Sequence, residues 1–345
     1  MVSKLKLVYL EGDNYKIGYQ HGKILSKQIE QVIQMRYKNV KNNLDITFDE
    51  VLKESEKYIY YVEKYFPDYI KEIEGLAKGS GQSFEKIFFI QVASEFIHKP
   101  IESCSAFGVT GKYTKNRNTI IGQNWDTSPN SQALQVILHI KPSDKPEILM
   151  FANPGVVGYM GLNKFGHAHV ANTLKSSGWH YGVTQYFLHR KFLETKSINE
   201  CVCIAKELPL SSSANYLVSD GEGAIIDIEI TPMNVQTIKS EKFLVHTNHF
   251  IHKELQKYEK NYEGLDSSIS RYERLNLLIK NNLPVDVQKM KSFLSDHNNY
   301  PNCICRHTPP HFTMASFIIE SQGGKLFVAS GNPCNTDFNV FSLNN

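Results

Sequence analysis

The stretch Glu102-Ser103-Cys104-Ser105-Ala106-Phe107-Gly108-Val109 decides the fold of this chain. It is short and apolar after a polar start, which is typical of a buried β-strand. Before it, roughly a hundred residues carry a mostly helical pattern, and after it strand patterns predominate. Cys104 therefore stands at the head of the β portion of the molecule.

Upstream of this strand, apolar side chains recur at helical spacing. The pattern predicts helices over 14–44 and over 49–98, with Pro67 and the Gly79-Ser80-Gly81 segment as interruptions.

Downstream, short apolar runs alternate with turn signals. Strands are predicted at 104–110, 118–125, 134–141, 147–152, 165–172, 214–219, 223–230, 233–239, 242–246, 312–320 and 324–330. Helices are predicted at 183–207, 269–282 and 286–295. Strands grouped around a helical insert, with helices at both ends, favour an α+β fold of one domain, and two stacked sheets covered by helices would give four layers.

The composition is that of an ordinary soluble protein. The chain has 345 residues, 41% of them hydrophobic and 21% charged, with a net charge of +3. Its lysines are scattered, so we expect no nucleic-acid partner. The N-terminus lacks the apolar core of a signal peptide, and no window reaches the ~18 apolar residues of a membrane span. We expect a cytoplasmic protein without membrane contacts. The sequence does not decide whether the protein forms a homo-oligomer.

Six cysteines in such a protein are expected to be reduced thiols. Cys303, Cys305, His307 and His311 form a Cys-x-Cys-x-His-x₃-His string. Structural zinc sites usually space their cysteines by about two to four residues, and a one-residue gap on a strand sends the two thiols to opposite faces. The string therefore predicts thiols rather than metal ligands, and we expect no metal and no other cofactor.

Six segments, taken in order along the chain, resemble a known family. They are Gly12–Gly22, Glu74–Gly81, Cys104–Gly108, Gly122–Asp126, His246–Phe250 and Gly331–Cys334. Together they resemble the penicillin acyl-CoA:6-aminopenicillanate acyltransferase family over nearly the whole chain. The resemblance implies an αββα sandwich of the N-terminal-nucleophile hydrolase type, made as a self-cleaving precursor or zymogen. It also implies a small-molecule substrate, either an acyl amide or an acyl-CoA-like thioester.

Cleavage before Cys104 would place a thiol and an α-amine on one residue. Their ordinary pKa values are about 8.5 and about 7.7–8.0, so the amine can accept the thiol proton near neutral pH. The thiolate would then attack a carbonyl and carry the acyl group as a thioester. Segment 1–103 would become a helical small subunit and 104–345 the catalytic portion, together forming one structural domain. A buried strand cysteine is the other interpretation of Cys104.

Ser103 departs from the family, which has glycine before the cysteine. A side chain narrows the φ range of this residue, and the strained turn that favours an N-to-S acyl shift is then less assured. The sequence leaves open whether the Ser103–Cys104 bond is cleaved.

The resemblance also implies roles for four polar residues. Asp126 would hold the new α-ammonium or orient the thiol. Asn248 would donate to the oxyanion, and Asn172 would supply a second donor. Arg306 would hold Asp126 or the surroundings of the amine by a forked hydrogen bond. The alternatives are a solvated strand-end aspartate, turn asparagines and a surface arginine.

Three functions remain open at this point. The chain could transfer acyl groups, or it could be a plain amide or peptide hydrolase, since the outcome depends on whether an amine or water meets the thioester. A non-catalytic binding protein, with zinc at Cys303 and Cys305, is the third. A papain-type pair with His246, His249 or His307 is not favoured, because such a cysteine begins a helix.

Overall fold

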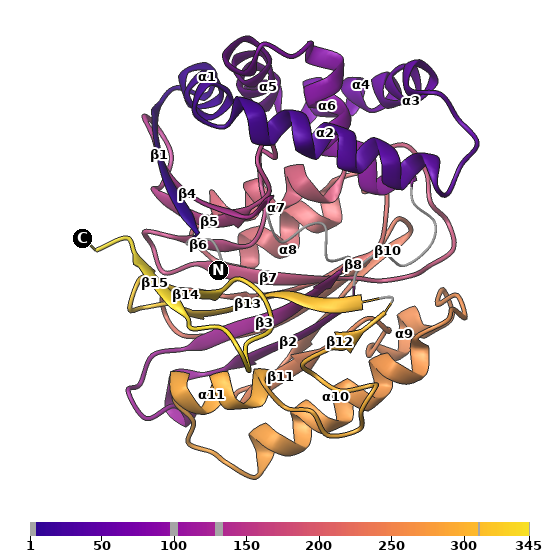
Figure 1. The fold of residues 1–345 in the computed structure, drawn as a ribbon. Coiled ribbons are helices and arrows are strands. Elements are labelled where there is room, and N and C mark those ends of the chain that lie inside the picture. Colours follow the sequence, from indigo (N-terminus) through magenta and orange to yellow (C-terminus); the bar gives the residue numbers. More distant parts are fainter. Residues whose placement is uncertain (1–4, 97–102, 128–133, 310, 345) are drawn as a thin grey trace.

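Two stacked β-sheets form the centre of the molecule, and helices cover both outer faces (Figure 1). The computed structural model describes residues 5–96, 103–127, 134–309 and 311–344. Its layers run helices, sheet, sheet, helices, which confirms the predicted α+β fold and the αββα sandwich.

The first sheet has the strand order β1-β4-β5-β6-β7-β8-β9-β10. Its strands are β1 (Lys6–Gly12), β4 (Val136–Pro142), β5 (Ile148–Ala152), β6 (Gly161–Asn163), β7 (Ala168–Thr173), β8 (Ala214–Ser219), β9 (Ile225–Thr231) and β10 (Asn234–Lys239). The neighbours are antiparallel, except that β1 pairs with β4 in parallel.

The second sheet has the order β11-β2-β3-β13-β14-β15, with β12 paired to β13. Its strands are β2 (Ser103–Val109), β3 (Ile120–Thr127), β11 (Phe243–His246), β12 (His307–Thr308), β13 (His311–Glu320), β14 (Lys325–Ala329) and β15 (Asn339–Ser342). Every residue of β2 and β3 is buried, because the sheet is covered on both faces.

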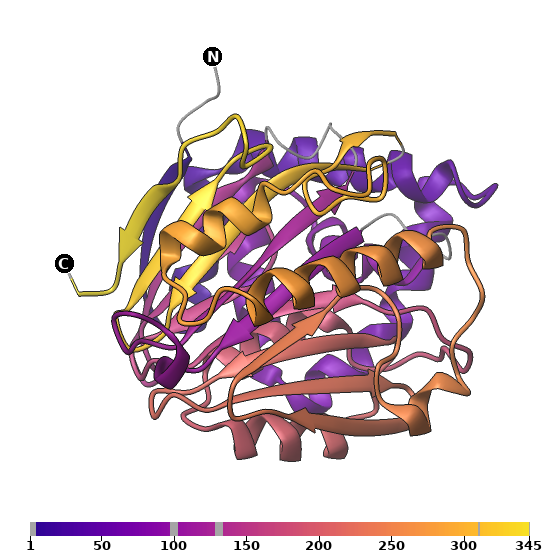
Figure 2. The same cartoon turned by 90° about the horizontal axis from the view of Figure 1, so that it is seen from below.

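The helices form the two outer layers. Over the first sheet lie α1 (Asn14–Ile24), α2 (Ser26–Lys41), α3 (Phe48–Ser55), α4 (Ile59–Tyr65), α5 (Pro67–Ser80), α6 (Phe84–Val92), α7 (Gln185–Leu193) and α8 (Ile198–Glu207). Against the second sheet lie α10 (Leu265–Lys280) and α11 (Val287–Leu294), seen from below in Figure 2, and α9 (Lys253–Gln256) is a single turn. Short 3₁₀ turns occur at Glu56–Tyr58, Ala93–Phe96 and Gly111–Tyr113.

Sequence signals set the helix ends. Asp13 caps α1 by accepting a hydrogen bond from the backbone N–H of Lys16. Pro67 is the first residue of α5, and Gly81 ends that helix in the left-handed region at a φ of 72°.

The first two of the six family-like segments, Gly12–Gly22 and Glu74–Gly81, lie mainly in α1 and α5, and these two helices pack against each other. A Cβ atom on Gly18 would lie 1.9 Å from the carbonyl oxygen of Glu72, and one on Gly79 would lie 2.1 Å from that of Tyr19. Backbone packs directly on backbone at this crossing, so these glycines are required for helix packing.

The faces of β2 belong to two different cores. Cys104 and Ala106 belong to the large core that includes the space between the sheets, whereas Phe107 and Val109 belong to the core beneath α10 and α11. Since successive strand residues point to opposite faces, Ser103 lies on the α10 side and Cys104 on the inner side.

Some sequence predictions need correction. Segment 1–103 is not purely helical, because β1 joins the first sheet, and β6, β12 and β15 were not predicted. The predicted helical interval 183–207 is two helices, α7 and α8. The end of the predicted 49–98 helical region lies outside the described residues. Among the described residues we find no helix with both the length and the apolar character that crossing a bilayer requires.

Candidate active site

Buried polar side chains converge on the peptide bond between Ser103 and Cys104, at the start of β2. The Asn248 side-chain oxygen Oδ1 accepts a hydrogen bond of 2.9 Å from the backbone N–H of Cys104. The same oxygen accepts a longer one, of 3.5 Å, from the Ser103 hydroxyl. These two hydrogen bonds join Asn248 to both residues that flank the bond. Cys104 itself is buried, with only 1% of its surface exposed.

Arg271, on α10, binds the C-terminal side of Cys104 and also binds Asn248, and no sequence motif pointed to it. Its Nη1 donates to the carbonyl oxygen of Cys104 at 2.5 Å and to the Ser105 hydroxyl at 2.8 Å, and its Nη2 donates to Asn248 Oδ1 at 3.1 Å. Burial lowers the pKa of the guanidinium, and the charge of Asp126 opposes this shift. The side chain is fully enclosed, so its charge acts in a medium of low polarity.

Arg306 lies beside the same bond but does not make the predicted fork on Asp126. Its Nη1 donates to the hydroxyls of Ser267 at 2.9 Å and of Ser103 at 3.4 Å. Its connection to Asp126 is indirect: the backbone N–H of Arg306 donates to Thr313 Oγ1, which donates to Asp126 Oδ1 at 2.7 Å. The arginine is buried, contrary to the surface alternative.

Asp126 is a buried carboxyl group opposite Ser103 in the β2–β3 ladder. Burial raises its pKa to about 6, although Arg271 and Arg306 act in the opposite direction. Its second oxygen, Oδ2, has no hydrogen-bond partner among the described residues. Directly opposed strand residues share a face, so the carboxylate lies on the Ser103 side of the sheet and the Cys104 thiol on the other. This placement suits a contact with an amine better than orientation of the thiol.

Asn172 and Asn248 lie side by side at the ends of β7 and β11. The Nδ2 of Asn172 donates to the carbonyl oxygen of Thr247 at 2.7 Å, and the Nδ2 of Asn248 donates to that of Thr173 at 3.1 Å. A carboxamide NH₂ has two donors, so each side chain keeps a second N–H. The structure thus brings both predicted oxyanion donors together.

A buried ion pair anchors the segment that carries Asn248. Burial alone would lower the pKa of His246, but Asp227 and Glu229 together raise it to about 9. The His246 Nε2 lies 2.7 Å from a Glu229 carboxylate oxygen. Glu229 also accepts hydrogen bonds from the backbone N–H groups of Ile251 and His252, so it fixes both sides of the turn at 247–250.

The other two histidines of the sequence analysis are engaged elsewhere. His249 Nδ1 lies 2.8 Å from the Ser268 hydroxyl. His307 contacts the thiols of Cys305 and Cys334.

The inner face beside Cys104 is aromatic. Trp125 stands opposite Cys104 in the ladder, and its ring lies 5.9 Å from Phe151 and 6.3 Å from Tyr159. Gln123 is on the same face, and its side-chain oxygen accepts the backbone N–H of Ala171 at 3.0 Å. The side chains nearest the thiol in the β2–β3 ladder are thus uncharged.

Known proteins share both the sequence pattern and the fold. The chain is 26% identical over 344 residues to the 40 kDa form of the acyl-coenzyme A:6-aminopenicillanic-acid-acyltransferase of Emericella nidulans. The alignment covers 96% of this chain and 94% of that protein. It is 22% identical over 380 residues to the beta-alanyl-dopamine/carcinine hydrolase of Drosophila melanogaster, with the same two coverages of 96% and 94%.

A solved structure of a mutant conjugated bile acid hydrolase from Clostridium perfringens superposes with a TM-score of 0.51 at 15% sequence identity, covering 69% of this chain and 92% of that chain. Residues 113–335 match the family described as acyl-coenzyme A:6-aminopenicillanic acid acyl-transferase. Because this match spans more than half of the sequence and the sandwich agrees with it, the chain belongs to that family of acyl-transferring and amide-cleaving enzymes and has the N-terminal-nucleophile hydrolase fold.

Proposed function

We propose that this enzyme cleaves its own chain between Ser103 and Cys104 and then uses Cys104 as an N-terminal nucleophile on a small acyl amide or acyl thioester. One observation carries the proposal. Asn248, Arg271 and Arg306, all buried, bind the residues on the two sides of a single peptide bond. Burying two guanidinium groups costs several kcal/mol each unless they are well bonded, and a packing role alone would not require them.

The proposed maturation is an N-to-S acyl shift followed by hydrolysis. The Cys104 sulfur attacks the Ser103 carbonyl carbon, the carbon–nitrogen bond breaks, and the thiol proton passes to the departing nitrogen. Water then cleaves the thioester and leaves a carboxylate on Ser103. The Cys104 nitrogen already donates to Asn248, and Arg271 holds the Cys104 carbonyl, so the new chain end would keep its position.

Asp126 would stabilise the product of this step. The new α-amine lies at the start of β2, where the Asp126 carboxylate shares the face of Ser103. A cation there would give the unbonded Oδ2 a partner and lower the pKa of the carboxyl group.

Turnover would use the same residue. The α-amine accepts the thiol proton, and the thiolate attacks the substrate carbonyl. The second N–H groups of Asn248 and Asn172 are the candidate donors to the oxyanion, and loss of one such donor typically costs roughly 3 kcal/mol in the transition state. The uncharged aromatic face at Trp125 suits an apolar acyl group.

Exposure supports the order of events. A thiol that is 1% exposed is inaccessible to an external substrate, so the uncleaved chain would be a latent precursor. Cleavage makes Ser103 a free chain end and allows it to leave the start of β2.

The test is the intact mass of the purified protein beside a Cys104→Ala variant and a Cys203→Ala control, since Cys203 is an exposed cysteine on α8. We expect the wild type and the control to give fragments of about 12 and 28 kDa, from the 39.4 kDa chain by length, and Cys104→Ala to remain whole. Cleavage that persists in Cys104→Ala would overturn the proposal, and so would an uncleaved wild type that turns over substrate.

Hydrolysis and transfer are separated by the fate of the acyl group. The names of the two relatives supply the probes: a β-alanyl amine for hydrolysis, and an acyl-coenzyme A with 6-aminopenicillanic acid for transfer. A transferase forms more amide product as the acceptor amine concentration rises, whereas a hydrolase forms free acid at an unchanged rate. In both cases the large fragment should gain the mass of the acyl group before turnover.

A further inference from the structure

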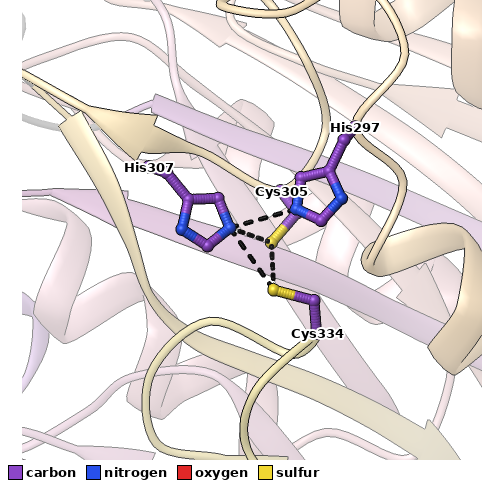
Figure 3. A group of neighbouring side chains, drawn as sticks. All are labelled: His297, Cys305, His307 and Cys334. Atoms are coloured by element: carbon purple, nitrogen blue, oxygen red, sulfur yellow. Dashed lines mark hydrogen bonds between the residues drawn. The ribbon is translucent and has the colours of Figure 1, made fainter.

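A second cluster of reactive side chains lies outside the candidate active site. The imidazoles of His297 and His307 and the thiols of Cys305 and Cys334 converge, and their nearest ligand atoms all lie within 4.8 Å of one another (Figure 3). They come from three separate segments: the loop after α11, the chain around the start of β12, and the loop after β14. All six cysteines lie in the described residues and none forms a disulfide.

Hydrogen bonding alone does not account for this arrangement. The His307 Nε2 lies 3.0 Å from His297 Nε2, 3.4 Å from Cys305 Sγ and 3.3 Å from Cys334 Sγ. One imidazole nitrogen either donates a single hydrogen or accepts with a single lone pair, so it cannot satisfy three neighbours. Two weak thiol donors and two imidazoles aimed at one point instead resemble a ligand set.

Four of the six distances between the ligand atoms also match a tetrahedral ion. Zn–S bonds of about 2.3 Å and Zn–N bonds of about 2.0–2.1 Å place two sulfurs about 3.8 Å apart, two nitrogens about 3.3 Å apart, and a sulfur and a nitrogen about 3.6 Å apart. The sulfurs of Cys305 and Cys334 are 3.7 Å apart, and the distances from His307 Nε2 to His297 Nε2 and to the two sulfurs fall within about 0.3 Å of these values. The His297 imidazole lies within 4.8 Å of both sulfurs.

We propose that His297, Cys305, His307 and Cys334 bind a Zn²⁺ ion with a structural role. Two thiolates and two imidazoles form a Cys₂His₂ set, and four protein ligands leave no open position for substrate. Binding releases the two thiol protons to solvent, so the ion and its two thiolates together carry no net charge. The amide of Asn332, 3.6 Å from Cys305 Sγ, would support the thiolate as an outer hydrogen-bond donor.

The ion would fix the backbone of Arg306, which lies between two of its ligands. Asn332 joins the two features, because its Nδ2 also donates to the Arg306 carbonyl oxygen at 2.7 Å. Zinc would therefore hold together the loops that present Arg306 to Ser103, at a distance from the reacting atoms.

The sequence string around Cys303 pointed to the wrong partners. The Cys303 thiol turns away and donates to the Cys305 carbonyl oxygen at 2.9 Å, and neither Cys303 nor His311 belongs to the cluster. The sequence argument placed the two thiols on opposite faces of a strand, but Cys303 and Cys305 lie in a bend before β12, so the premise was wrong although Cys303 does lie outside the cluster. However, Cys305 and His307 find their partners in distant segments, which local spacing could not indicate.

The first measurement is the zinc content of the full-length protein, purified without chelator under reducing conditions. We expect one Zn²⁺ per chain. Stripped protein should regain one equivalent of Zn²⁺, and Co²⁺ in its place should give the visible bands of a tetrahedral ion with thiolate charge transfer. The melting temperature should fall when the ion is removed and return when Zn²⁺ is added.

Variants locate the ion. Cys334→Ser and His297→Gln should reduce the zinc content to background, while Cys203→Ser should match the wild type. His297 is exposed, so its variant should fold even if the change at Cys334 disturbs the loops. Stripped wild-type protein that fails to bind Zn²⁺ would overturn the proposal. The proposal would also be overturned if Cys334→Ser and His297→Gln each kept one Zn²⁺ per chain. A Cys305–Cys334 disulfide found by peptide mapping of protein purified under reducing conditions would overturn it as well. These readouts are independent of self-cleavage and can be made on Cys104→Ala protein.

Discussion

Replacing Asp126 by asparagine should make the protein more stable while it abolishes maturation. The carboxyl group is buried, and its pKa is raised from 3.8 to about 6. The folded state thus binds this proton more tightly than the unfolded state, and stability is lost as pH rises from about 4 to about 6. A shift of about two units corresponds to roughly 3 kcal/mol of unfavourable free energy at neutral pH.

Asparagine has nearly the same shape, keeps an oxygen to accept from Thr313, and does not titrate. We expect the free energy of unfolding of Asp126→Asn, relative to its parent, to rise by roughly 3 kcal/mol between about pH 4 and about pH 7.5. Both proteins should carry Cys104→Ala, so that each is a single chain. Urea unfolding at the two pH values measures the difference.

A difference in stability that is the same at both pH values would refute the reasoning, because the raised pKa alone produces the pH dependence. In the Cys104 protein, Asp126→Asn should lose self-cleavage, because the new ammonium has no counterion. A variant that is both more stable and fully processed would show that the buried charge has no role in maturation.

Three further changes test other parts of the structure. Arg271→Lys should slow self-cleavage roughly tenfold to a hundredfold, because each hydrogen bond to a charged group contributes roughly 1.5–3 kcal/mol. Arg274→Lys, which changes a partly exposed ion pair on the same helix, should cleave normally. Time courses of cleavage by mass spectrometry measure both variants. Gly18→Ala should lower the free energy of unfolding by roughly 3 kcal/mol or more, because its Cβ would meet a backbone oxygen at 1.9 Å, and urea unfolding beside exposed Lys23→Ala checks this. The raised pKa of His246 should contribute roughly 3 kcal/mol of stability below about pH 6.5 that is lost as pH rises to about 9, and in His246→Gln this decline should disappear from the unfolding curves.

Local patterns were enough to predict most of the fold. Strands β2 and β3 and helices α10 and α11 lie close to their predicted ranges, because each shows a clear apolar period bounded by turn residues. The β1 strand was missed because its parallel partner, β4, is more than a hundred residues away in the sequence.

Some residues of the candidate site could be predicted from the sequence and others could not. Cys104, Asp126 and Asn248 fall within recognisable motifs, so sequence could point to them. Arg271 has no motif, and Arg274 three residues later looks equivalent in the sequence. The available signal was its position: Arg271, Leu275 and Ile279 form one buried stripe of α10, and a charged residue on an apolar stripe needs an explanation.

The β1–β4 pairing has a consequence for the lifetime of the mature enzyme. All seven residues of β1 are in register with β4, and α1, α2, α5 and α6 pack over the same sheet. After cleavage before Cys104, fragment 1–103 would therefore stay packed against fragment 104–345. Under the proposed cleavage, the protein would fold once, as a single chain. Refolding after the cut would be an encounter between two molecules, and its yield would depend on their concentration. Maturation would then be a one-way step, and an enzyme that unfolds at low concentration would not recover.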